Sequence, residues 1–509
     1  MNAKIRRQLK ARKHRIQYRL DKNNLKNLDK PVFTASNIHY EFAERGRGIT
    51  YGGIGALHLL GHRIGLARAI DERLRLLQVH LPYHESDHVL NFAYNALCGG
   101  TCIQDIELRR QDEVFLDAIG AQRIPDPTTA GDFCRRFSAA DINTLIDAFN
   151  DVRKGVWARQ PATFFDLAKI DMDGTLVETS GECKAGMNIA YDGTWGYHPL
   201  IVSLANTNEV LSVVNRSGNR PSHEGAAAEV DRAVRVCFEG GFRRVLLRGD
   251  TDFSQTKHLD RWTKDARVQF IFGLDCTDRR HFLADELPRM SWQTLERPPR
   301  YQVKTTPRER PTKVKEQIVI DNEYENKRLQ SERVAEMPYR PTACRKTYRL
   351  IVVRKNLSVE RGGVWLFDDY LYFFYLTNDW QRTPAEIVFD ANDRCNQENL
   401  NAQLKSGVRA LTAPVDTLES NWAYMLMTSL AWNLKAWWAL WPTEAPGRWN
   451  ERHRHDKATI LGMEFKTFLN AFLRMPCQIV RTGRRIVYRL LGWNPWQHVF
   501  FRTFEQLRC

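Results

Sequence analysis

Residues 383–407, TPAEIVFDANDRCNQENLNAQLKSG, decide how the rest of the chain is interpreted. Thr383, Pro384 and Glu386 form a capping box with proline at the first helical position. Gly407 is a typical residue for ending a helix. These signals predict one continuous helix of about six turns, at 3.6 residues per turn.

Three charged residues of this helix are spaced so that they share one face. Arg394, Glu398 and Lys405 are separated by four and then by seven positions, which is helical spacing. For an isolated pattern, a solvated ion-pair face is the commoner explanation. The alternative is a catalytic carboxylate held between two cations, and the surrounding chain decides between the two.

Upstream, residues 161–275 predict the alternating strands and helices of an α/β core. Apolar runs predict strands at Phe164–Met172, Pro199–Ala205, Val210–Val214, Arg244–Arg248 and Val268–Leu274, with helices at Glu224–Phe238 and Thr256–Lys264. Three strands, a helix, a strand, a helix and a strand is the order of a ribonuclease-H-like core. Asp173 and Asp250 follow the first and fourth of these strands, and functional groups in open α/β sheets gather at strand carboxyl ends.

Asp173, Asp250 and Glu398 therefore form a candidate catalytic trio. Carboxylates that share a pocket repel one another unless divalent cations neutralise them, and Mg²⁺ or Mn²⁺ prefers oxygen ligands. Two such ions, about 3.5–4 Å apart, can clamp the attacking and leaving oxygens of a phosphoryl transfer. No protein nucleophile is then needed.

Each member of the trio also has a structural explanation. Asp173 and Asp250 could cap the turns that follow them, and Glu398 could simply pair with a neighbouring cation. Taken together, these explanations do not account for acids at all three topological positions. Asp171 lies on the same strand face as Asp173, and Asp252 follows Asp250, so both are candidates to support or replace the trio.

Other regions surround this core. The predicted boundaries are a basic N-terminal arm (1–45), a helical DNA-binding or dimerisation domain (46–160), the first part of the core (161–275), a β-rich insertion (276–382), the last core helix (383–420) and a mostly helical C-terminal region (421–509). Predicted strands of the insertion are Tyr301–Lys304, Glu316–Ile320, Tyr348–Val353 and Leu371–Leu376. In the C-terminal region we predict helices at 417–441 and 456–474 and a basic hairpin at 479–489.

The charge balance favours a polyanionic partner. The 509 residues include 75 Lys and Arg against 60 Asp and Glu, a net charge of +15, which is typical of nucleic-acid-binding proteins. The first acidic residue after the basic N-terminal run is Asp21, and a solubilising tail is the alternative explanation of that run. Candidate DNA-phosphate contacts are Arg6, Arg7, Lys10, Arg12, Arg394, Lys405, Arg484 and Arg485.

Cysteine and histidine positions predict structural roles. The ten cysteines show no disulfide framework, and no secretory signal is apparent, so we expect a cytoplasmic, nucleoid-associated protein. The pairs His84/His88 and Cys98/Cys102 match no common zinc module. The apolar stretch Trp422–Trp441 contains Asn433 and Lys435, which predicts a buried helix and no membrane association.

Three motifs resemble those of a known family. IDMDGT (170–175), LRGDTDF (247–253) and RCNQENLNAQLK (394–405) resemble the DDE transposases of bacterial insertion sequences, within the insertion-sequence-four-like superfamily and its thirteen-eighty branch. GGTCIQDIELRRQDEVFLDAIG (99–120) and PDPTTAGDF (125–133) resemble the helical N-terminal domain of that group. The signature Y-x2-R-x3-E-x6-K fits, except that Ala391 replaces its tyrosine. Thr251–Asp252 replaces a Ser–Gly pair, which favours Asp250 over Asp252.

The resemblance implies a transposase that acts as a homodimer or larger synaptic complex on double-stranded DNA, at terminal inverted repeats and a target. Two Mg²⁺ or Mn²⁺ ions would be held by Asp173, Asp250 and Glu398. A water molecule would cut one strand, and the freed 3′-hydroxyl would attack another phosphodiester, in some relatives through a hairpin intermediate. Trp292 and Trp365 are candidates to stack an extruded base, with core packing as the alternative. Competing functions are a catalytically silent DNA-binding derivative and a ribonuclease-H-like nuclease without strand transfer.

Overall fold

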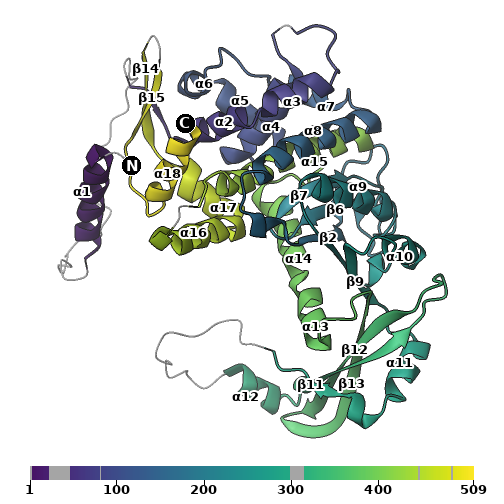
Figure 1. Cartoon of the computed structure of the whole chain (residues 1–509). Coiled ribbons are helices and arrows are strands. Elements are labelled where there is room, and N and C mark those ends of the chain that lie inside the picture. Colours follow the sequence, from purple (N-terminus) through teal and green to yellow (C-terminus); the bar gives the residue numbers. More distant parts are fainter. Residues whose placement is uncertain are drawn as a thin grey trace.

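A nine-stranded mixed sheet runs through the protein, in the order β10-β11-β12-β13-β9-β8-β2-β6-β7 (Figure 1). The computed structural model describes residues 3–21, 46–80, 82–297, 314–444, 447–482 and 485–508. The sheet strands are β2 (Ala168–Gly174), β6 (Leu200–Leu204), β7 (Glu209–Val214), β8 (Val245–Gly249), β9 (Val268–Leu274), β10 (Gln293–Thr294), β11 (Glu325–Tyr339), β12 (Tyr348–Arg361) and β13 (Val364–Thr377). The predicted mixed α/β class is confirmed.

The central half of the sheet places two predicted aspartates at one edge. Strands β2, β6 and β7 form an antiparallel meander, while β8 and β9 run parallel to β2. Helix α9 (Ala226–Glu239) packs on β2 and β6, and α10 (Thr256–Trp262) connects β8 to β9. Because β2 and β8 are parallel neighbours, their carboxyl ends meet at the same edge.

Four of the five predicted core strands are confirmed, and the first begins later than predicted. Residues 164–165 lie in the 3-10 turn Ala162–Phe165, and β2 starts at Ala168. The rings of Phe164 and Phe165 pack on Phe242, with centroids 5.3 and 5.5 Å away. This aromatic cluster holds the segment against the domain instead of letting it extend the ladder.

The insertion continues the same sheet. Strand β13 pairs antiparallel with β9 over residues 374–377 and 271–274, and its other edge pairs with β12. Helix α11 (Asp278–Asp285) precedes β10. The long strands β11, β12 and β13 project beyond the core as an antiparallel ribbon (Figure 1).

One predicted strand of the insertion is wrong. Glu316–Ile320 belongs to helix α12 (Val314–Asp321). Among the described strands none pairs with this segment, and local contacts form instead, such as the 2.7 Å bond from Gln317 to Asp321. The predicted strand Tyr301–Lys304 lies outside the described residues. The predictions at Tyr348–Val353 and Leu371–Leu376 are confirmed within β12 and β13.

The organising helix is broken, which corrects the prediction of one continuous helix. It consists of α13 (Pro384–Asp393), α14 (Cys395–Ala402) and a π-turn over Gln403–Gly407. The predicted capping box is present at its start. The backbone N–H of Arg394 bonds to Ala391, three residues back rather than four. In the π-turn, Val408 bonds to Gln403, so the helical phase shifts beside Lys405.

Helices form the N-terminal region, and two long helices pack against β7 at the edge of the sheet. The N-terminal helices are α1 (Ala3–Leu20), α2 (Ile54–Arg63), α3 (Leu66–Arg73), α4 (Glu85–Leu97), α5 (Ile106–Arg110), α6 (Glu113–Ile119), α7 (Pro127–Cys134) and α8 (Ala139–Trp157). The predicted helix at 417–441 is α15 (Leu418–Leu440), whose apolar length packs against α4, α8 and β7. No described helix meets the length and hydropathy needed to cross a bilayer.

A buried carboxylate joins these layers. Glu209, at the start of β7, is fully buried and accepts hydrogen bonds from Arg153 and Trp157 of α8 at 3.0 and 2.9 Å. It also accepts from Trp437 of α15 at 2.7 Å and from Thr207 at 2.6 Å. The N-terminal helices, the sheet and α15 therefore share one core.

The C-terminal region ends in a small sheet and helices. Strands β1 (Gly48–Ile49), β14 (Cys477–Thr482) and β15 (Arg485–Leu490) pair, which confirms the predicted hairpin. The predicted helix at 456–474 is instead α16 (Asn450–Gly462), α17 (Phe465–Phe468) and a π-turn, because Met463 adopts an extended backbone. Helix α18 (Gln497–Arg508) follows, and β3 (Val177–Glu178), β4 (Asn188–Ile189) and β5 (Trp195–Tyr197) form a further three-stranded sheet.

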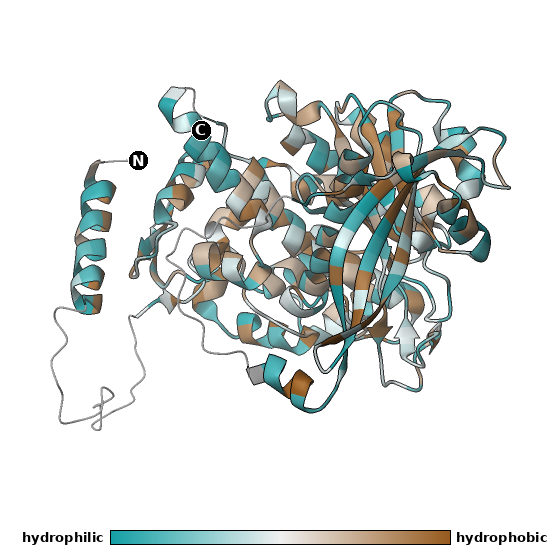
Figure 2. Ribbon diagram, turned by 90° about the horizontal axis from the view of Figure 1, so that it is seen from below, coloured by the Kyte–Doolittle hydropathy of each residue, from teal (hydrophilic) through white to brown (hydrophobic). Residues whose placement is uncertain are grey.

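Helix α1 is hydrophilic over most of its surface (Figure 2). Its Arg12 guanidinium donates to the carbonyls of Leu490 and Gly492, at 2.7 and 3.0 Å. These bonds place α1 beside the end of β15 (Figure 1).

Candidate active site

The three predicted acids act on one another electrostatically. Asp173 is the penultimate residue of β2, Asp250 directly follows β8, and Glu398 lies on α14. Burial raises the pKa of Asp173 to about 7, and the charges of Asp250 and Glu398 contribute to that rise. Three separate elements thus bring their carboxylates into one electrostatic cluster.

The Asp250 carboxylate caps the turn that follows it, as predicted, and also belongs to the acidic cluster. One carboxylate oxygen accepts the backbone N–H of Asp252 at 3.1 Å, and the other lies 3.4 Å from the Arg394 guanidinium. Burial raises the pKa of Asp250, the Asp252 and Glu398 charges raise it further, and the Arg394 charge opposes them. The site therefore carries more negative charge than its one paired arginine compensates.

The two cations of the helix face the acids. The side chain of Arg394 is 14% exposed, and its ion pair is with Asp250 rather than with Glu398, one turn along the helix. Lys405 is half-buried; burial lowers its pKa, and the nearby Asp173 carboxylate opposes that shift. The assignment of Arg394 and Lys405 to DNA phosphates stays a prediction.

The two neighbouring aspartates have different surroundings. Asp171 is 1% exposed, and both its oxygens accept from Arg248 of β8 at 2.7 Å. Such bidentate pairing occupies the carboxylate and makes Asp171 a support of the sheet. Asp252 is exposed at the rim.

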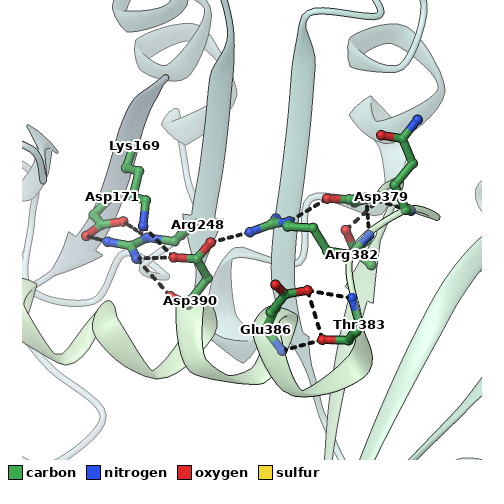
Figure 3. Close-up of polar contacts among 10 residues, drawn as sticks. Lys169, Asp171, Arg248, Asp379, Arg382, Thr383, Glu386 and Asp390 are labelled. Carbon is green, nitrogen blue, oxygen red and sulfur yellow. Dashed lines mark hydrogen bonds and ion pairs between the residues drawn. The ribbon is translucent and has the colours of Figure 1, made fainter. Parts of the chain in front are cut away.

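An ionic network ties α13 to the two strands that carry the aspartates (Figure 3). Arg248 donates to the backbone carbonyl of Asp390 at 2.8 Å, and the Asp390 carboxylate pairs with Lys169 of β2 and with Arg382. Arg382 also pairs with Asp379 at 2.6 Å, immediately before α13. The network sets where α13 lies, and hence where α14 presents Glu398.

The basic residues predicted to contact DNA from the N-terminal arm and the hairpin lie on other elements than the three acids, on α1 and β15 (Figure 1). Arg6, Arg7 and Lys10 are exposed on α1, whereas Arg12 is half-buried against β15. Arg485 is exposed on β15. Arg484 lies outside the described residues.

The chain was compared with known proteins. A family model described as "Transposase DDE domain group 1" matches residues 33–509. The chain belongs to this DDE transposase domain family. No curated protein matches it. It is similar to a solved chain in a cryo-EM structure of a piggyBac transposase synaptic complex with hairpin DNA, at 11% identity, a TM-score of 0.34 and 84% coverage of each chain.

The DDE domain contains site residues that sequence reasoning missed. Asn401 of α14 donates to Asp173 at 2.8 Å. His198 is buried, and a Cβ atom at Gly174 would lie 2.7 Å from its Nε2 atom, which explains why glycine follows Asp173. Burial lowers the pKa of His198, while the charges of Asp252 and Lys405 act on it in opposite directions. The sequence carried one signal of this contact: two amides, Gln397 and Asn401, interrupt the otherwise apolar stripe on the buried face of α14.

The helical region of this DDE domain contains the histidines and cysteines for which structural roles were predicted. His88 stacks on Phe133, with centroids 4.2 Å apart, in the core. Within the described residues, the ligand atoms of His80, His84 and Glu85 lie within 4.8 Å of one another. However, the His80 and His84 rings are stacked at 14° and 4.2 Å, so no single ion can lie in the plane of both. Cys98 is buried and Cys102 exposed, which favours structural roles for these residues.

Proposed function

We propose that this protein is a transposase that cleaves and joins DNA at the ends of its own element by metal-dependent phosphoryl transfer. The observation that carries the proposal is the electrostatic cluster of Asp173, Asp250 and Glu398 in a chain of the DDE family. These three residues are the proposed catalytic groups.

The donor set fits two Mg²⁺ or Mn²⁺ ions. It consists of hard carboxylate oxygens, which these cations prefer. Burial, and then the charges of neighbouring carboxylates, raise the pKa of both aspartates, and a bound cation would favour their ionised forms. Asp173, Asp250 and Glu398 would hold the ions. When bound, the ions would activate a water molecule for cleavage and neutralise charge on the transferring phosphodiester.

Further details rest on the strand order and the motif resemblance. The antiparallel meander β2-β6-β7 with β8 and β9 parallel to β2 supports a ribonuclease-H-like core. The motifs support membership of the insertion-sequence-four-like superfamily, thirteen-eighty branch, acting as a dimer or larger complex on inverted repeats in the cytoplasm. If hairpin ends form, the 59% exposed Trp365 is better placed to stack a base than the 9% exposed Trp292, which lies under Arg354.

The acids can be tested one at a time on DNA that flanks the gene. Asp173→Asn, Asp250→Asn and Glu398→Gln should each abolish Mg²⁺-dependent strand cleavage and leave end binding largely intact, because each removes a charge that would hold a cation. Asp252→Asn tests the neighbouring candidate, which is exposed beside the site; it should still cleave if Asp250 rather than Asp252 is the catalytic residue. Full cleavage by all three variants would refute the assignment.

The same assay separates the competing functions. Joined products from the wild-type protein support transposition, whereas cleaved ends without joined products would assign a nuclease. Binding of ends with no cleavage in Mg²⁺ or Mn²⁺ would assign a catalytically silent DNA-binding protein.

A further inference from the structure

The buried face of α14 contains two amides. Gln397, Leu400, Asn401 and Leu404 recur at helical spacing and are all buried. Leu400 and Leu404 are ordinary core residues. Gln397 and Asn401, at 2% and 6% exposure, must find hydrogen-bond partners inside the protein.

Those partners form a series of hydrogen bonds that runs from Ser203 on β6 to Asp173. The hydroxyl of Ser203, itself 1% exposed, donates to Oε1 of Gln397. Nε2 of Gln397 donates to Oδ1 of Asn401 at 3.4 Å. Nδ2 of Asn401 donates to Oδ2 of Asp173 at 2.8 Å. Each link is buried or half-buried.

The Asp173 carboxylate determines which group donates and which accepts at each hydrogen bond of this series. As a metal ligand Asp173 would be ionised, and an ionised carboxylate only accepts hydrogen bonds, so Asn401 would turn its NH₂ group toward it, as observed. Its oxygen then faces Gln397, which must in turn present its own NH₂ group. The oxygen of Gln397 is left to accept the hydroxyl proton of Ser203, as observed.

From this geometry we propose that Asn401, oriented by Gln397 and Ser203, is a positioning residue for metal binding. It engages Oδ2 of Asp173 and leaves Oδ1 as the oxygen offered to a cation. This inference rests on the proposed function, because it assumes that Asp173 is a metal ligand.

The same contact also sets the distance between two of the acids. Asn401 follows Glu398 by three residues on α14, so its bond to Asp173 ties the helix of the third acid to the strand of the first. Asn401 lies within the x6 stretch of R-x3-E-x6-K, at a position that the signature does not specify. Partners of this kind, which hold a metal-binding side chain, change metal affinity by about 10–100-fold when they are removed.

The experiment uses the full-length protein and Mn²⁺ alone. Free Mn²⁺ is followed by electron paramagnetic resonance in a DNA-free titration, and the Mg²⁺ concentration for half-maximal cleavage is measured in parallel. Asn401→Ala should weaken Mn²⁺ binding and raise the half-maximal Mg²⁺ concentration by about tenfold or more. Asn399→Ala is the matched control, because Asn399 is exposed on the same helix; it should behave as wild type.

A second variant tests the direction of this series of hydrogen bonds and covers the case in which Asn401→Ala does not fold. Gln397→Glu keeps the shape but cannot donate, so Asn401 would turn its oxygen toward Asp173. We expect it to weaken Mn²⁺ binding as Asn401→Ala does. Wild-type Mn²⁺ affinity in a folded Asn401→Ala or Gln397→Glu protein would overturn the inference.

Failure of the positioning role is distinguishable from failure of the proposed function. If Asp173→Asn abolishes cleavage and Asn401→Ala keeps the wild-type metal dependence, only the positioning role is wrong. If Asp173→Asn itself binds Mn²⁺ and cleaves as wild type, the proposed metal site is wrong and this inference falls with it.

Discussion

Lys435 shows how a single buried charge is tolerated in the core. It lies on α15 at 1% exposure, donates to the carbonyl of Leu461 at 2.9 Å, and its ammonium lies 3.8 Å from the ring centroid of Trp432. Among the residues that the structure describes, no carboxylate pairs with it. Burial lowers its pKa to about 7.

We expect Lys435→Met to change the pH dependence of stability. The pKa of a lysine in the unfolded chain is about 10.4, so between pH 7 and 10 the unfolded state binds more protons, and wild-type stability rises with pH. Methionine removes that linkage. In urea unfolding, the variant should gain a few kcal/mol relative to wild type at pH 6, and this gain should shrink by about 2 kcal/mol between pH 7.5 and 9. A gain that is constant with pH would contradict the shift.

At this scale the sequence identifies charged site residues better than neutral ones. The positions of Asp173, Asp250 and Glu398 in the fold were predictable, because strand ends and a helical spacing place them. Asn401 was not, because its role depends on which buried atom faces it across the fold. The direction of the Asp171 side chain was predictable, because Asp171 shares a strand face with Asp173. Its ion-pair partner Arg248 was not, because it comes from a strand far along the sequence.

The broken helix α13–α14 combines a local signal at its start with a tertiary contact at its break. The start was predictable, because the capping box is a local signal. The interruption at Arg394 was not, because its guanidinium is drawn to Asp250 on another element. The same holds for the strand that became α12, where the absence of a pairing partner among described strands outweighed local propensity.

Asp390 anchors this element and offers a direct test. Asp390→Asn should weaken the pairs with Lys169 and Arg382, lower the free energy of unfolding by about 1–3 kcal/mol and slow cleavage, because α14 then holds Glu398 less firmly. Thermal unfolding and the cleavage assay measure the two effects.

Asp393→Asn is the control for that variant, since Asp393 is exposed at the end of the same helix. It should leave both quantities unchanged. Equal effects of Asp390→Asn and Asp393→Asn would show that general charge loss, and not the anchor, is responsible.

For the molecule as a whole, the net charge of +15 predicts salt-sensitive DNA binding. Replacing Arg6, Arg7 and Lys10 together with alanine should reduce the slope of log affinity against log salt by about 2 to 3, because each phosphate contact contributes about 0.9. Fluorescence anisotropy with element-end DNA at several salt concentrations measures this slope.

The control for that triple variant is Arg244→Ala. Arg244 is exposed where β8 begins, at the opposite end of this strand from Asp250. Its slope should equal that of wild type. An unchanged slope in the triple variant would mean that α1 contributes to solubility rather than to DNA binding.

The fold class was predictable from the sequence, but the joining of its parts into one sheet and one core was not. Strand periodicity identified most of the core, and the composition change at residue 276 marked the insertion. That β13 would pair with β9, and that α8 and α15 would meet at Glu209, depends on contacts between distant segments that no local pattern records.

The shared contacts of Glu209 have a consequence for the protein's descent. Removing α8 would take away the donors Arg153 and Trp157, and removing α15 would take away Trp437. Either loss would leave this buried carboxylate short of hydrogen bonds, at a cost of several kcal/mol. A crossover near residue 160 must therefore bring a matching α15 with it. The first and last thirds of this chain are expected to be inherited together.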